Sequence, residues 1–242
     1  MNISPLMRKA LAEFLGVAFF LTAILGAVNS GSPFAAAALS TVLGLAILAT
    51  ASISGGHLNP AVSIYFYSRQ ALSLSELVTY IAAQLLGAVL GTWVGLTLWN
   101  KSLEFNGAHT STSAPFLVAE LVATGGLVWL VGRLASTDNG SKIPAAVGLW
   151  VFAAATFTPT GAEANPAVAF GLLFAGHSIS ETGLYMLMQL LGMLFASLFV
   201  TIFAEKKAAK VAVAEAAAPA PKTAARKPAA KKAPAKKPAA KK

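Results

Sequence analysis

The chain has 242 residues, of which 56% are hydrophobic and only 11% are charged. A soluble domain of this length needs more charge to cover its surface, so the composition excludes an ordinary soluble protein and favours a membrane protein. The net charge of +9 belongs to residues 205–242, which carry +10, whereas residues 1–204 carry −1. The chain has no cysteine, which excludes disulfides and cysteine-based metal or nucleophile sites.

Six long apolar segments follow one another along residues 1–204. Each is close to the ~20 residues that cross a hydrocarbon core ~30 Å thick. Backbone groups in lipid must be satisfied within the segment, so helices are expected rather than strands. The expected spans are Leu11–Val28, Phe34–Ile53, Leu77–Trp99, Phe116–Leu134, Ile143–Phe157 and Thr182–Phe203.

The first segment follows Arg8 and Lys9, and a basic start before an apolar run is also typical of a cleaved signal peptide. The length of the run, the presence of Glu13 within it and the five spans that follow favour a membrane span instead.

Lys and Arg near the segment ends predict the orientation of the chain. Six crossings place one group of basic residues on a single side, with only Lys101 on the other; that group is Arg8, Lys9, Arg69, Arg133, Lys142 and Lys206. We therefore expect a multi-pass protein of the cell (plasma) membrane with both termini in the cytoplasm.

The two halves of the chain, about 7–100 and 115–204, match at a nearly constant offset. Ala12-Glu13 recurs as Ala119-Glu120, and Gln84-Leu85-Leu86-Gly87 recurs as Gln189-Leu190-Leu191-Gly192. Between these matches, Asn59-Pro60-Ala61-Val62 recurs as Asn165-Pro166-Ala167-Val168. Three crossings per half is an odd number, so the second half must be inverted relative to the first.

Each Asn-Pro-Ala motif precedes an apolar run that is too short to cross a bilayer, at Val62–Tyr67 and Val168–Phe174. Asn is a preferred helix N-cap and Pro is preferred at the first helical position. An isolated motif would indicate an ordinary helix start. Two copies at the repeat offset predict two half-helices that re-enter the membrane from opposite faces.

These paired motifs, with Ser54-Gly55-Gly56-His57-Leu58 before the first, resemble those of the aquaporin (major intrinsic protein) family. The resemblance covers about residues 7–204, and the short loops and basic tail look prokaryotic. It implies an all-α membrane fold with six transmembrane helices and two re-entrant half-helices in an inverted repeat. It also implies a homotetramer with one pore per subunit, and a channel for water and small uncharged solutes rather than an enzyme.

In such a pore the side-chain amides of Asn59 and Asn165 donate hydrogen bonds to a passing oxygen, and the positive ends of the half-helices oppose cations. Backbone carbonyls upstream of each motif accept hydrogen bonds from the solute. The expected carbonyls are those of Gly56, His57, Leu58, Ala162, Glu163 and Ala164.

The family's second motif usually continues with arginine, and this chain has Val168 there instead. By similarity of spacing, the selectivity filter falls at Leu39, Ala153, Ala162 and Val168. Such a filter has no charge and no side-chain donor, so glycerol, urea, ammonia, peroxide and metalloid acids become candidate solutes beside water. The alternative is that Leu39 packs across the gap, or that another side chain replaces the arginine.

Three glutamates lie at or near membrane depth, where charge is costly and is a candidate for function. In the family, glutamates equivalent to Glu13 and Glu120 accept hydrogen bonds that hold the motif loops; a proton relay is the alternative. Glu163, two residues before Asn165, is expected to be a solvated loop carboxylate, with solute binding or cation attraction as the alternative.

No residue cluster shows metal-ligand spacing, so neither a metal site nor a cofactor is predicted. His57 precedes the first motif, where a structural or gating role is expected, whereas His109 and His177 fall in connections.

Residues 205–242 are rich in Ala, Lys and Pro, and are expected to form a disordered cytoplasmic tail that binds anionic lipid or, as the alternative, nucleic acid. The rival functions are a non-conducting structural or adhesive membrane protein, a proton-coupled small-solute transporter, and a membrane-tethered nucleic-acid binder.

Overall fold

The structure is a computed structural model that describes residues 3–204. The predictions for the basic tail, 205–242, lie outside the described residues. Within residues 3–204, six helices are long and apolar enough to cross a membrane, which confirms the predicted number of spans. They are α1 (Pro5–Ser30), α2 (Ala35–Ser54), α4 (Leu74–Thr97), α5 (Ala114–Ala135), α6 (Ile143–Phe157) and α8 (Ile179–Ile202).

Two short helices, α3 (Pro60–Ser68) and α7 (Pro166–Leu172), are the half-helices. Each begins at the proline of an Asn-Pro-Ala motif, as the N-cap argument requires. The connections hold a 3₁₀ turn, Gly140–Lys142, and two strands, β1 (Glu104–His109) and β2 (Ala175–His177), which pair in parallel. The strands were not expected from the sequence.

The start of α4 lies upstream of the predicted start at Leu77 because polar residues begin the helix. The Ser73 side chain accepts from the Glu76 amide, and the Glu76 side chain accepts from the Ser73 amide, which forms a capping box. Likewise the Ser178 side chain caps α8 by accepting from the Glu181 amide. Hydropathy detects the apolar part of such a helix but not its polar first turn.

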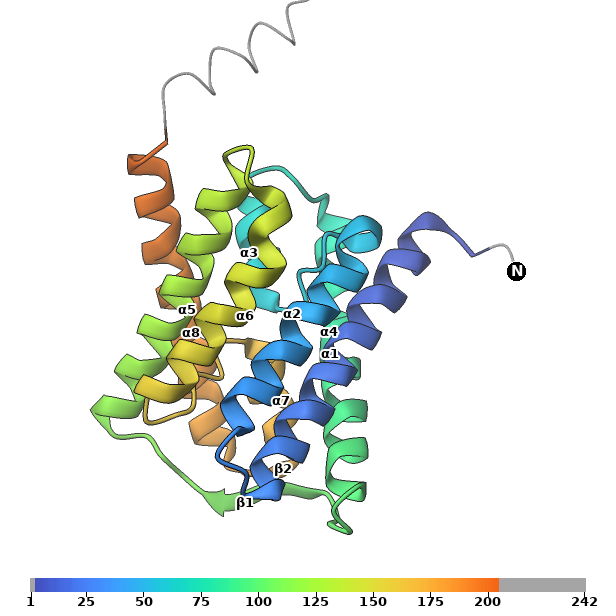
Figure 1. Ribbon diagram of the computed structural model, residues 1–242, viewed down its shortest axis with the longest axis vertical. Helices are drawn as coiled ribbons and strands as arrows, with labels where there is room; N and C mark the ends of the chain where they lie inside the picture. The colour runs from blue at the N-terminus through green and yellow to red at the C-terminus, as the bar shows by residue number, and fades with distance from the viewer. Residues whose placement is uncertain (1–2, 205–242) are drawn as a thin grey trace, which may run out of the picture. The chain divides into compact units, whose positions relative to one another are not determined.

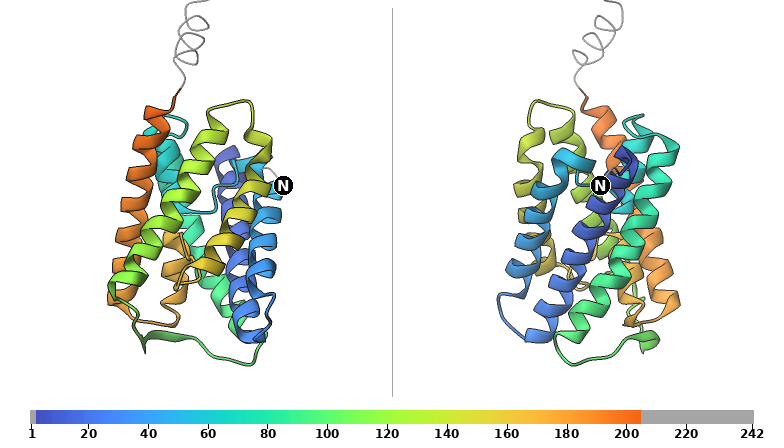
Figure 2. Two further views of the ribbon diagram at one scale, coloured as in Figure 1. Left: turned by 60° about the vertical axis from the view of Figure 1, so that its left-hand side comes forward. Right: turned by 90° about the vertical axis from the view of Figure 1, so that its right-hand side faces the viewer.

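The helices form two equivalent sets, as Figures 1 and 2 show. In the first, α1 packs against α2 and α4; in the second, α5 packs against α6 and α8. Two glycines in repeat-related positions allow close approaches between helices. A Cβ added at Gly87 would collide with the Phe14 carbonyl of α1, and one at Gly192 with the Leu121 carbonyl of α5. Small residues at these positions let membrane helices pack backbone to backbone.

The basic residues gather at the end of the bundle where α1 begins and α8 ends. Arg69 donates to the Ser197 carbonyl and the Thr201 hydroxyl, and Arg133 donates to the Phe203 carbonyl. Lys101 instead donates to Asn29 at the far end of α1, where β1 and β2 also lie (Figure 1). Lys and Arg are thus distributed unequally between the two ends of the bundle, which is the kind of distribution from which the positive-inside rule predicts orientation.

Candidate functional site

The candidate site is built on the first residues of the two half-helices, α3 and α7. Asn59 and Asn165 both adopt extended backbone conformations and cap their helices through the side-chain oxygen. Asn59 Oδ1 accepts from the Ala61 amide and Asn165 Oδ1 from the Ala167 amide, each at 2.9 Å. The oxygen of each side chain is thus held by its own helix, which leaves the amide nitrogen to point away from it.

The two motifs bond to each other reciprocally. Asn59 Nδ2 donates to the Ala164 carbonyl at 2.9 Å, and Asn165 Nδ2 donates to the Leu58 carbonyl at 2.8 Å. Both asparagine side chains are buried. Residues 106 positions apart in the sequence therefore meet at one point, with the N-termini of α3 and α7 on either side of it (Figure 1).

The loops before the two motifs share an unusual backbone pattern. Gly56 and Leu58 have φ of 62° and 49°, and the equivalent Ala162 and Ala164 have φ of 56° and 48°. Left-handed conformations are costly for residues with a side chain and persist only where the surroundings impose them. The strain shared by Leu58 and Ala164 indicates that each loop is held in a fixed path rather than left free.

Glu13 of α1 is one of the groups that hold the first loop. Its Oε1 accepts from the Ser54 hydroxyl at 2.6 Å and the His57 amide at 3.0 Å. Its Oε2 accepts from the Leu58 amide and from Gln84 Nε2, both at 2.7 Å. The carboxylate is fully buried, and this set of donors offsets the cost of burying its charge.

Glu120 of α5 has the same role in the second loop. Its Oε1 accepts from the Glu163 amide at 3.2 Å, and its Oε2 accepts from the Ala164 amide at 2.9 Å and from Gln189 Nε2 at 2.7 Å. The Ala12-Glu13/Ala119-Glu120 and Gln84/Gln189 repeat pairs are thus two copies of one structural device.

Two cavities meet at the motifs. The inner cavity, of about 50 Å³, is lined by both asparagines, by the loop residues Gly56, His57, Leu58, Glu163 and Ala164, and by apolar side chains. The outer cavity, of about 830 Å³, opens toward β1 and β2 and is lined in part by Leu39, Ala162 and Val168. Phe20 and Glu163 line both cavities, so the two adjoin there.

Three of the four predicted filter residues therefore face one cavity, and the fourth does not. Ala153 is exposed on α6 and lines neither cavity. The α6 wall is formed instead by Val151 in the inner cavity and Ala155 in the outer one. These two are four residues apart and share a helix face, whereas Ala153 lies between them and points away. The placement of Ala153 in the filter is corrected accordingly.

His57 lies against the aromatic wall of the inner cavity. Its ring stacks on Phe66 with 4.7 Å between ring centroids, and its Nδ1 lies 3.2 Å from the Ser63 hydroxyl. Both Phe66 and His57 line the cavity, so the side chain packs at the wall of the passage.

Glu163 is not the solvated loop carboxylate that the sequence suggested; that expectation is wrong. Only 7% of its side chain is exposed, and its Oε1 lies 3.6 Å from His177 Nδ1. Its Oε2 is buried and has no hydrogen-bond partner among the described residues. The loop carries Glu163 inward because its amide is tied to Glu120.

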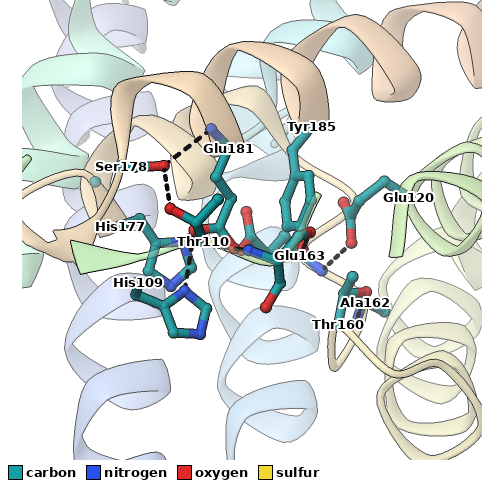
Figure 3. Close-up of polar contacts among 12 residues, drawn as sticks. His109, Thr110, Glu120, Thr160, Ala162, Glu163, His177, Ser178, Glu181 and Tyr185 are labelled. Carbon is teal, nitrogen blue, oxygen red and sulfur yellow. Dashed lines mark hydrogen bonds and ion pairs between the residues drawn. The ribbon is translucent and has the colours of Figure 1, made fainter. Parts of the chain in front are cut away.

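A cluster that the sequence analysis missed lies beside Glu163 in the outer cavity (Figure 3). His109, His177 and Glu181 place possible ligand atoms within 4.8 Å of one another. Burial lowers the pKa of His177, Glu181 raises it and His109 lowers it further, and the net shift is downward. His109 lies 68 residues before His177 in the sequence, and the i, i+4 pair of His177 and Glu181 alone did not indicate a metal site. The helix start from Ser178 to Glu181 indicated only that Glu181 would be held in place.

Comparisons with known proteins agree with this geometry. The family model described as "Major intrinsic protein" matches residues 1–160. The chain is 32% identical over 207 residues to a probable aquaporin TIP3-2 of Oryza sativa subsp. japonica, covering 76% of this chain and 77% of that protein. It is 30% identical over 202 residues to the aquaglyceroporin AqpS of Rhizobium meliloti (strain 1021), covering 77% and 86%.

Among solved structures, the X-ray structure of the aquaglyceroporin from Plasmodium falciparum matches with a TM-score of 0.65 over 86% of this chain and 99% of that chain. The sequence identity is 23%, so this match supports the fold alone.

Proposed function

The chain belongs to the major intrinsic protein family and forms a membrane channel for water and small solutes, and on that premise we propose that the two Asn-Pro-Ala motifs select what passes. The observation that carries the proposal is the reciprocal bonding of Asn59 and Asn165 in the wall of the inner cavity, close to Glu163, which lines both cavities. Each amide nitrogen has two N–H groups and uses one across the motif pair, which leaves the other for a passing oxygen.

Ions are excluded, in this proposal, by the two half-helices. The N-terminus of each helix carries about half a positive charge, and both face the junction of the cavities. A cation there loses its hydration and meets two positive dipole ends, whereas water exchanges its hydrogen bonds for those of the asparagines and the loop carbonyls. Because Val168 replaces the usual arginine, these dipoles carry the exclusion without a fixed charge in the filter.

The solute range follows from the predicted filter residues, which are apolar although charged and polar side chains also line the outer cavity. Leu39, Ala162 and Val168, with Ala155 in place of the expected Ala153, present no side-chain donor and no charge. The cavity volume of about 830 Å³ leaves room for solutes larger than water on that side of the motifs. We therefore propose that glycerol, urea, ammonia, peroxide or undissociated metalloid acids pass beside water. The resemblance to a protein named an aquaglyceroporin supports this range.

The hydrogen bonds of Glu13 and Glu120 favour a passive channel over a proton-coupled transporter. Every carboxylate oxygen of Glu13 and Glu120 accepts at least one hydrogen bond from an N–H or O–H group. Carboxylates whose oxygens are all engaged in this way act as structural acceptors. A proton relay would require them to give up these bonds.

The setting of the channel is part of the same proposal. The protein spans the cell membrane with both termini in the cytoplasm, assembles as a homotetramer with one pore per subunit, and uses no cofactor. The basic tail, residues 205–242, binds anionic lipid headgroups rather than nucleic acid, since it is tethered to the bilayer.

Stopped-flow light scattering of proteoliposomes with a panel of neutral solutes tests the proposal. We expect flux of water and of at least one larger neutral solute above that of protein-free liposomes. Water flux without any flux of larger solutes would refute the wide filter, and no flux at all would favour the non-conducting alternative.

A further inference from the structure

Four ionisable side chains from two strands, one helix and one loop converge on the outer cavity. His109 ends β1, His177 ends β2, Glu181 lies in the first turn of α8, and Glu163 lies in the loop before α7. All four line the same cavity. Figure 3 shows the four side chains near one another.

The donor atoms have the separations of a metal site. Glu181 Oε2 lies 3.0 Å from His109 Nδ1 and 3.8 Å from His177 Nδ1, and Glu163 Oε1 lies 3.6 Å from His177 Nδ1. Tetrahedral zinc, with bonds of ~2.0–2.1 Å to histidine nitrogen, sets its ligand atoms roughly 3.3 Å apart. The ligand atoms of His109, His177 and Glu181 all lie within 4.8 Å of one another, and Glu163 stands next to this group. A shared ion would require the two stacked imidazole rings to turn toward it.

The framework around these donors is rigid. Strand pairing sets His109 directly opposite His177, and their rings stack with centroids 4.6 Å apart. Glu181 Oε1 accepts from the Ser111 amide at 3.2 Å, while Tyr185 donates to the Ser111 carbonyl at 2.8 Å. Second contacts of this kind orient ligands in established metal sites.

A second, independent observation favours a cation next to these side chains. Glu163 lines the outer cavity. Its Oε2 atom is buried and has no hydrogen-bond partner among residues 3–204. Leaving a buried carboxylate oxygen unsatisfied is costly, whereas a bound cation would satisfy it. Two carboxylates and two imidazoles also match the charge and the ligand preference of a divalent transition-metal ion more closely than those of Mg²⁺ or Ca²⁺.

We propose that His109, His177 and Glu181, with Glu163 next to them, form a binding site for a divalent transition-metal cation such as Zn²⁺, and that occupancy of this site slows permeation. The site shares the outer cavity with Leu39, Ala162 and Val168, and Glu163 lines both cavities. A bound ion therefore sits on the solute path, where it obstructs neutral solutes and adds a positive charge next to the motifs. The effect on flux rests on the proposed channel function, whereas the binding does not.

Binding is tested by isothermal titration of ZnCl₂ into the full chain, prepared without a histidine tag and first stripped of metal with EDTA. We expect one Zn²⁺ per chain, and a loss of affinity of roughly tenfold or more in His109→Ala. His109 is suited to this test because 56% of its side chain is exposed, so the substitution removes little packing. No binding to the wild-type chain, or unchanged affinity in His109→Ala, would overturn the site.

Two controls sharpen the result. Glu104→Gln removes a carboxylate that lines the same cavity outside the cluster, and should leave Zn²⁺ affinity unchanged. X-ray absorption at the zinc edge should show two imidazole ligands in the wild-type chain and one in His109→Ala. A spectrum with oxygen ligands alone would contradict the proposal even if zinc bound.

The effect on permeation is measured on proteoliposomes with ZnCl₂ on both sides, since reconstituted protein can face either way. Zn²⁺ should lower the flux of wild-type and Glu104→Gln protein and leave that of His109→Ala unaffected. Zinc binding without loss of flux would refute the obstruction. Absence of flux before zinc is added would instead refute the channel, and the titration would still decide the site.

Discussion

Asn59 and Asn165 each donate a side-chain N–H to the backbone carbonyl of the residue directly before the other, Ala164 and Leu58, at 2.9 and 2.8 Å. Each also caps its own half-helix through the opposite atom of the same amide. One side chain thus fixes both the start of a helix and the contact with its repeat-related partner. The two halves of the inverted repeat are thus joined at the two asparagines, where we place solute selection.

Replacing Asn165 by Ala tests this double role. The substitution removes an N-cap, which costs ~0.5–2 kcal/mol, and a buried hydrogen bond, which contributes ~0.5–1.5 kcal/mol. We expect a lower thermal unfolding midpoint together with reduced water flux. Asn139→Ala, in the exposed connection before α6, is the matched control and should change neither property. If the two variants have the same unfolding midpoint and the same water flux, the contact between the two motifs contributes to neither stability nor permeation.

Glu120→Gln tests the support of the second loop. Glutamine would turn an NH₂ group toward donors that now bond to a carboxylate, which leaves buried N–H groups unsatisfied at a cost on the order of 1–3 kcal/mol each. A clear fall in unfolding temperature is expected by fluorescence. Glu76→Gln is the control, because its ion pair with Lys9 is partly exposed and glutamine can still complete the capping box. A larger loss in Glu76→Gln would argue against the loop-support role.

Val168→Arg restores the charge that the family pattern usually has. In the outer cavity it should narrow the passage, and we expect the ratio of glycerol to water permeability to fall about tenfold, which corresponds to ~1.4 kcal/mol in barrier height. Val168→Leu adds volume without charge and should change the ratio less. If both variants leave the ratio at the wild-type value, the filter lies elsewhere.

Gly192→Ala tests the packing of α8 on α5. An added Cβ would overlap the Leu121 carbonyl, and overpacking of this kind costs ~1–3 kcal/mol. Thermal unfolding should begin at a lower temperature. Gly183→Ala is matched to it on the same helix, where a Cβ would meet no atom within 4 Å, and it should be neutral or mildly stabilising. A neutral Gly192→Ala would show that the helices can separate without loss.

Removal of residues 211–242 should leave permeation intact, because every residue that lines the two cavities lies before them. The measurement is water flux per inserted chain, with insertion checked by extraction from the membrane. Lost flux from a normally inserted truncation would assign the tail a part in transport.

The sequence predicted the helices well wherever an apolar run defined them. The bounds of α6 match those expected, and the half-helices begin at Pro60 and Pro166 because Asn-Pro is a local start signal. The prediction failed at Leu77, where the polar first turn of α4 escaped the hydropathy pattern although Ser73 and Glu76 form a recognisable capping box.

The outer cluster could not have been predicted in the same way. His109 and His177 become neighbours only through the pairing of β1 with β2, and short strands in polar connections leave little pattern in the sequence. Glu163 was misjudged because its burial depends on where Glu120 pulls the loop. Ala153 was misplaced because a spacing taken from a family does not fix which face of α6 turns toward the cavity.

The most direct test of the account is the temperature dependence of osmotic water flux through proteoliposomes, measured with potassium leak in the same preparation. A preformed polar path at the two asparagines predicts fast water flux with a weaker temperature dependence than that of protein-free liposomes, and no potassium leak. Water flux that matches protein-free liposomes in rate and temperature dependence, or a potassium leak that rises with the amount of protein, would contradict it.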